Sequence, residues 1–83
     1  MKVLVVDDSE AIRKMMISAL KCIGVTHVDE AGDGDEGCAS CAGANYELII
    51  MDLHMPKMDG FEAVAKLRSE GKKMPIIIMS TDG

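Results

Sequence analysis

The feature that most constrains the fold is a short apolar run that ends in a single carboxylate. Residues 48–51 read Leu-Ile-Ile-Met, Asp52 follows directly, and a loop bounded by Pro56 and Gly60 comes next. Four apolar residues without polar alternation predict a strand buried on both faces, which is typical of parallel sheets. A carboxylate after such a strand lies at the edge where open α/β folds bind ligands. Asp52 alone does not exclude the simpler interpretation that it only ends the strand before a turn.

Two other apolar runs also end in polar side chains. Residues 3–6 are followed by Asp7 and Asp8, and residues 76–79, again expected to be buried on both faces, are followed by Ser80. A fourth, more polar strand is expected over 25–31, and its charges are typical of a sheet edge, where they discourage mispairing.

Helices are expected between the strands. Ser9 suits an N-cap and Gly24 a C-cap, and the residues between them show the i, i+3, i+4 apolar spacing of an amphipathic helix. Its apolar positions are Ile12, Met15, Met16, Ala19, Leu20 and Ile23. A short second helix is expected over 35–43. A third follows Gly60, with an apolar stripe of Phe61, Val64, Ala65 and Leu67.

The resulting order, βαβαβαβ, predicts one small α/β domain over residues 1–83, with right-handed crossovers and a parallel sheet. A net charge of −5 argues against non-specific nucleic-acid binding, and 2% aromatic residues leave little for stacking on bases. The early acid at Asp7 precludes a signal-peptide core or membrane span there, and three cysteines form no disulfide scaffold. We therefore expect a cytoplasmic protein with no nucleic-acid or membrane partner.

The polar strand ends form a constellation, because the carboxyl ends of parallel strands share one edge. Two carboxylates about 4 Å apart repel by roughly 4 kcal/mol at an effective dielectric of about 20. A hard divalent cation relieves this repulsion, and ligands that are all oxygens favour Mg²⁺ or Mn²⁺ over zinc. Asp52 is then a candidate nucleophile that forms an acyl phosphate, and Ser80 a candidate donor to a phosphoryl oxygen.

These residues resemble the CheY-like receiver domain of two-component response regulators. The resemblance covers the whole chain and rests on three features: Asp7-Asp8 after the first strand, the sequence D-L-H-M-P-K-M-D-G over 52–60, and P-I-I-I-M-S over 75–80. It implies a flavodoxin-like, doubly wound parallel sheet with strand order 2-1-3-4. It also implies that the chain is not an enzyme, beyond assisting its own phosphorylation and dephosphorylation.

The resemblance further implies the roles of the site residues. Asp52 is the phosphoacceptor, which receives its phosphoryl group from a sensor histidine kinase. Asp7, Asp8 and Asp52 hold Mg²⁺, together with the backbone carbonyl of His54. Ser80 corresponds to the switch hydroxyl.

The sequence also departs from the family. The family's fifth strand and last two helices have no counterpart here, so the domain is expected to be truncated after the fourth strand. The family's phosphate-pairing lysine is missing with them. Lys72 and Lys73 precede the fourth strand, and therefore lie at the opposite end of the sheet, whereas Lys57 is on the correct side but in a loop.

Two alternative functions remain. One is a truncated receiver that assembles with itself without effective phosphosignalling, as a homodimer or larger oligomer joined through the exposed edge of strand four. The other, a haloacid-dehalogenase-type phosphatase, is weaker, because Asp7-Asp8-Ser9 lacks the D-x-D pattern expected on the first strand.

Two local patterns have structural interpretations. Cys38-x-x-Cys41 is expected on a helix face, where free cysteines pack as small hydrophobes rather than as a redox pair. Gly60, beside the site, is expected to adopt a positive φ angle.

Overall fold

The sheet contains, in spatial order, β2 (His27–Ala31), β1 (Lys2–Val6), β3 (Leu48–Asp52) and β4 (Ile76–Met79), and each neighbouring pair is parallel. The computed structural model describes residues 1–80. Its elements are β1 (Lys2–Val6), α1 (Glu10–Cys22), β2 (His27–Ala31), α2 (Gly34–Gly43), β3 (Leu48–Asp52), α3 (Gly60–Ser69) and β4 (Ile76–Met79). The predicted α/β class, flavodoxin-like sheet and strand order are confirmed. No helix within residues 1–80 is long and apolar enough to cross a membrane.

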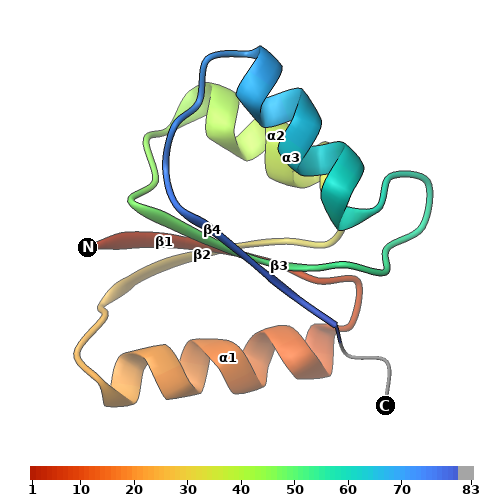
Figure 1. The fold of residues 1–83 in the computed structure, drawn as a ribbon. Helices are drawn as coiled ribbons and strands as arrows, with labels where there is room; N and C mark the ends of the chain where they lie inside the picture. The colour runs from red at the N-terminus through yellow and green to blue at the C-terminus, as the bar shows by residue number, and fades with distance from the viewer. Residues whose placement is uncertain (81–83) are drawn as a thin grey trace.

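The strand order reverses direction between β1 and β3, and this reversal positions the site. The chain moves outward from β1 to β2 and then returns past β1 to β3. The helices on the two sides of this reversal therefore cover opposite faces of the sheet. Helix α1, which follows β1, lies on one face, and α2 and α3 lie on the other (Figure 1). In open α/β sheets the crevice at such a switch point is the usual ligand site.

The hydrophobic core lies mainly on the α2 and α3 side. It contains alternate residues of β1 and β3 together with apolar residues of the two helices and the loops beside them. The buried members are Leu4, Val6, Ala31, Cys38, Cys41, Tyr46, Ile49, Met51, Met55, Ala63 and Leu67. Cys38 and Cys41 are free thiols in this core, which confirms the packing interpretation of the C-x-x-C pattern.

The helices begin at side-chain caps. The Ile12 N–H donates to Oγ of Ser9 at 3.3 Å, as predicted for α1. Asp33 caps α2, and Asp59 forms a reciprocal capping box with Glu62 at the start of α3. These side chains satisfy donors that a helix N-terminus leaves unpaired, so they fix where the chain turns from each strand end into its helix.

The expected apolar stripe of α1 is only partly correct. Met15 is 67% exposed and Ile23 is 78% exposed, and no residue of α1 is fully buried. Half-buried residues of α1 include Ile12, Met16 and Leu20. The spacing predicts a stripe, but α1 packs against the sheet without a second helix beside it. The apolar stripe is therefore wider than the part of α1 that contacts the sheet.

The stripe predicted for α3 is wrong at Phe61, which is 65% exposed, and at Ala65, which is also exposed. The buried positions of α3 are Gly60, Ala63 and Leu67. Where α3 packs on α2, the small side chain of Ala63 allows a close approach, and Sγ of Cys38 lies 4.0 Å from the carbonyl oxygen of Ala63.

Strand β4 departs from the expectation of burial on both faces. None of its residues is fully buried, and Ile77 is 50% exposed. Its neighbours in register are Ile50 of β3 and, one strand further, Val5 of β1. Ile77 therefore lies on the α1 face, at the margin of the sheet that α1 does not reach.

Candidate functional site

Three carboxylates from β1 and β3 meet at the switch point. One carboxylate oxygen from each of Asp7, Asp8 and Asp52 lies within 4.8 Å of the other two. Asp7 and Asp52 are buried, with exposures of 1% and 2%, whereas Asp8 is exposed. The site therefore consists of two buried carboxylates and one exposed carboxylate. The predicted convergence of these three residues is confirmed.

Asp7 is held by hydrogen bonds at both its backbone and its side chain. Its N–H donates to the carbonyl of Ala31 at 3.1 Å, and its Oδ1 accepts the N–H of Ser9 at 2.8 Å. Its Oδ2 is buried, and no group within residues 1–80 donates a hydrogen bond to it. A buried carboxylate oxygen without a partner is costly unless a cation or donor satisfies it.

Burial is the main cause that raises the pKa of Asp7, and the negative charges of Asp52 and Asp8 raise it further. Both causes disfavour the ionised form, and the positive charge of a bound cation would oppose them. The donor set contains only oxygen atoms, and one of them is buried and unsatisfied. This chemistry fits a hard divalent cation held by Asp7, Asp8 and Asp52.

Gly60 fixes the end of β3 by a close approach. Its N–H donates to the carbonyl of Leu53 at 2.8 Å, and a Cβ at position 60 would lie 2.8 Å from the carbonyl oxygen of Asp52. The expectation of a positive φ here is wrong, since the positive-φ glycines within residues 1–80 are Gly24 and Gly71. Glycine is needed because backbone meets backbone without room for a side chain.

Ser80 and His54 lie at the same edge of the sheet as the acids. Met79 is in register with Asp52, and the N–H of Leu53 donates to the carbonyl of Met79 at 2.8 Å. Ser80 comes one residue later and is exposed. His54 follows Asp52 by two residues and is also exposed. The roles of the Ser80 hydroxyl and the His54 carbonyl stay predictions.

The lysines are distributed as the sequence predicts. Lys57 is exposed in the loop between β3 and α3, on the side of the site, and has a φ of 69°. Lys72 lies at the other end of β4, where its N–H donates to the carbonyl of Leu67 at 3.0 Å. Lys72 is therefore too far from the acid cluster to contribute a charge to it.

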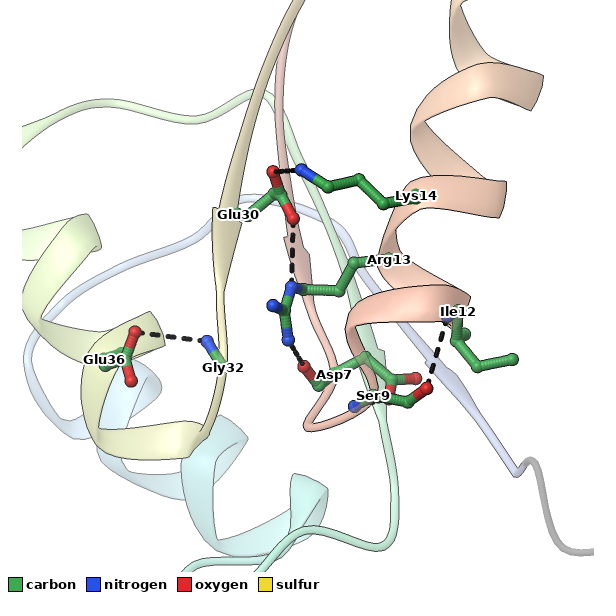
Figure 2. Close-up of polar contacts among 8 residues, drawn as sticks. All are labelled: Asp7, Ser9, Ile12, Arg13, Lys14, Glu30, Gly32 and Glu36. Atoms are coloured by element: carbon green, nitrogen blue, oxygen red, sulfur yellow. Dashed lines mark hydrogen bonds and ion pairs between the residues drawn. The ribbon is translucent and has the colours of Figure 1, made fainter.

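Arg13 is a residue of this region that sequence reasoning missed. Its Nη1 donates to the carbonyl oxygen of Asp7 at 2.6 Å (Figure 2). A signal was present, because Arg13 lies one turn into α1, where the helix dipole disfavours a cation. A cation at that position indicates nearby acceptors, but the sequence does not say which they are.

The sequence matches the family model described as the response regulator receiver domain over residues 3–83. The chain belongs to this family. Receiver domains are modules of two-component signalling systems, and the acid cluster lies within the matched residues.

Curated relatives extend the match. The receiver is 43% identical over 82 residues to the transcriptional regulatory protein ResD of Bacillus subtilis, covering 99% of this chain and 33% of that protein. It is 40% identical over 86 residues to the chemotaxis protein CheY1 of Helicobacter pylori, covering all of this chain and 69% of that protein. The chain thus spans one third of the length of the first and about two thirds of the second.

Solved structures agree with the fold of the receiver. The chemotaxis protein CheY4 of Vibrio cholerae has a TM-score of 0.89 at 39% identity, with 99% of this chain and 69% of that chain covered. The response regulator TrrA of Thermotoga maritima, solved in complex with Mg²⁺-BeF, has a TM-score of 0.88 at 34% identity. Its match covers 96% of this chain and 70% of that one.

Proposed function

We propose that this receiver domain accepts a phosphoryl group on Asp52 from the phosphohistidine of a sensor histidine kinase, in a reaction that requires Mg²⁺ or Mn²⁺. The observation that carries the proposal is the acid cluster, in which carboxylate oxygens of Asp7, Asp8 and Asp52 lie within 4.8 Å of one another. The similarity to TrrA, whose structure contains Mg²⁺-BeF, supports it.

The chemistry is a transfer between two nucleophiles. A carboxylate oxygen of Asp52 attacks phosphorus, the O–P bond of an acyl phosphate forms, and the N–P bond of the phosphohistidine breaks. The imidazole nitrogen keeps the electron pair of the broken bond and takes up a proton. Asp52 is 2% exposed, so its carboxylate is largely shielded from bulk water.

Asp7 and Asp8 would hold the cation together with Asp52 and the backbone carbonyl of His54. The cation would neutralise charge on the phosphoryl oxygens. Ser80 would donate its hydroxyl to one of these oxygens, because it follows β4 at the same edge as Asp52. The receiver would therefore act as a phosphoacceptor rather than as an enzyme, and would work in the cytoplasm.

The first experiment combines metal binding with labelling. Millimolar Mg²⁺ should raise the melting temperature, because it binds the folded site and not the unfolded chain. Acetyl phosphate with Mg²⁺ should then add a phosphoryl group to Asp52, detected by peptide mass spectrometry. Residues 80–83 contain no lysine that could pair with the phosphoryl group, so labelling of residues 1–83 alone should be slow.

Two variants separate the site from general acidity. Asp52→Asn should abolish the label, and Asp8→Asn should weaken the effect of Mg²⁺ on melting. Asp35→Asn, on the exposed first turn of α2, makes the same chemical change outside the cluster and should alter neither result. An unlabelled wild type with an unchanged melting curve in Mg²⁺ would contradict the proposal.

We also propose that β4 joins this chain to a second copy of itself, which is the alternative function as a self-assembling module. The two outer strands differ in chemistry, because β2 presents Asp29 and Glu30 whereas β4 has the sequence Ile-Ile-Ile-Met. Charge on β2 discourages strand addition, and the apolar edge of β4 favours it. The net charge of −5 makes a protein the favoured partner over nucleic acid or an anionic membrane.

Sedimentation velocity at micromolar concentration tests this assembly. Wild type should sediment as a dimer or larger species, and Ile77→Lys should sediment as a monomer. His27→Lys, on the opposite edge strand, is the control and should leave the assembly intact. A wild type that stays monomeric would overturn the role of β4 without affecting the proposal for Asp52.

A further inference from the structure

Arg13 connects three elements beside the acid cluster. Its Nη1 donates to the carbonyl oxygen of Asp7 at 2.6 Å, and its Nε donates to Oε1 of Glu30 at 3.0 Å. Figure 2 shows the guanidinium of α1 between the end of β1 and the side chain from β2. Lys14 contacts the other oxygen of Glu30, with Nζ 2.7 Å from Oε2. One carboxylate thus receives two cations, of which only Arg13 continues to Asp7.

The contact with Arg13 completes the restraint of Asp7. The N–H of Asp7 is bound to Ala31, its Oδ1 to Ser9, and its carbonyl to Arg13. Within residues 1–80, Oδ2 is the one polar atom of Asp7 that has no hydrogen-bond partner. The backbone on both sides of this ligand is therefore held in place before any cation arrives.

Burial distinguishes the two cations that contact Glu30. The side chain of Arg13 is 16% exposed, whereas that of Lys14 is 59% exposed. A solvent-exposed ion pair contributes little, but a shielded guanidinium with two acceptors has a fixed orientation. Hydrogen bonds from Lys14 and Arg13 lower the pKa of Glu30, so this carboxylate stays ionised at neutral pH.

We propose that Arg13 is a positioning residue for the cation site, holding the carbonyl of Asp7 so that its carboxylate meets those of Asp8 and Asp52. The inference rests on the function proposed for this site and adds an element to it. Glu30 acts one step further away, because it orients the guanidinium. Residues that hydrogen-bond to metal ligands in this way hold the ligands at the correct separation for a cation.

Charge and geometry make opposite predictions here. The guanidinium is positive, so a purely coulombic role would weaken cation binding, and its removal would tighten binding. A positioning role gives the reverse result, because a released Asp7 backbone must be ordered again when the cation binds. Arg13→Lys separates these effects, since it keeps the charge but loses the fork that contacts two acceptors at once.

The experiment measures Mg²⁺ affinity by NMR titration of the backbone amides of Asp7, Asp8 and Asp52, and stability by thermal melting. Arg13→Met should weaken Mg²⁺ binding about tenfold, and Arg13→Lys about threefold or more. Lys14→Met is the matched control, because it also removes one positive charge and one contact to Glu30. It should change the Mg²⁺ affinity by less than about twofold.

The outcomes separate the two proposals. A wild type whose amides do not respond to Mg²⁺ would contradict the proposed function itself. If wild type responds to Mg²⁺ and both Arg13 variants bind Mg²⁺ as tightly as wild type or more tightly, only the role of Arg13 is overturned. A purely structural contact would lower the melting temperature of Arg13→Lys and leave its Mg²⁺ affinity unchanged.

Discussion

The two faces of the sheet carry similar apolar strands but are covered very differently. On the side of α2 and α3, Ala63 and Leu67 are fully buried, and Cys41 is 1% exposed. On the other side lies α1 (Figure 1), which has no fully buried residue and whose Met15 is 67% exposed. Two helices that pack on each other seal their face, whereas a single helix shields only the middle of the sheet. Stability should therefore depend much more on the first face.

Removing volume from each face should give the largest difference. Leu67→Ala should lower the free energy of unfolding by about 3 kcal/mol, because it leaves a cavity in a closed core. Leu20→Ala on half-buried α1 should lower it by about 1 kcal/mol, since water already reaches the site. Urea denaturation checks both values. Equal losses would show that α1 is as tightly packed as α3.

Adding volume should sharpen the same contrast. A Cβ at Gly37 would lie 3.1 Å from Cγ2 of Val6, so this position of α2 has little spare room. Gly37→Leu should cost about 2 kcal/mol through overpacking. Ala19→Leu on the exposed surface of α1 should stay within about 0.5 kcal/mol of wild type. A neutral Gly37→Leu in the same urea assay would mean that the packed face can expand.

Tyr46 extends the packed face to the β2 edge and makes stability depend on pH. Its hydroxyl donates to Oδ2 of Asp29 at 2.6 Å, and burial, followed by this contact with Asp29, raises its pKa to about 12. A raised phenol pKa stabilises the fold below the unfolded value of about 10, and this contribution is lost as pH rises from there towards 12.

Tyr46→Phe should therefore cost about 1 kcal/mol at neutral pH and reduce the loss of stability above pH 10. Urea denaturation at a series of alkaline pH values measures both effects. An alkaline decline as steep as that of wild type would assign the pH dependence to other groups.

The smallest effect should come from the open face. Met15→Lys should change the free energy of unfolding by no more than about 0.5 kcal/mol, because the side chain is already 67% exposed. Thermal melting in dilute solution checks this, with Ala63→Lys on the packed face as the unfolding control. A large loss for Met15→Lys would show that this part of α1 is covered in solution.

The acid cluster was predictable because the chemistry of strand ends is local in sequence. Asp7, Asp8 and Asp52 each follow an apolar run, and parallel strands bring such positions to one edge. The alternation of strands and helices likewise predicts the class, and the resemblance to receiver domains supplied the order that the structure confirms. For the acids the signal lies within a few residues of the position that it describes, whereas the class and the strand order depend on patterns along the whole chain.

What only the tertiary structure decided is how far each apolar pattern is covered and which contacts join distant segments. The periodicity of α1 predicts a stripe, but its width could not reveal that Met15 and Ile23 face solvent. The sequence predicts a positive φ angle at Gly60, but the fold requires glycine there because its backbone lies close to the carbonyl of Asp52. Arg13 joins the carbonyl of Asp7 to the carboxylate of Glu30, 17 residues away in the sequence, because α1 packs beside β1 and β2. A sequence pattern specifies what a residue can bury or donate, and its neighbours in space decide whether it does.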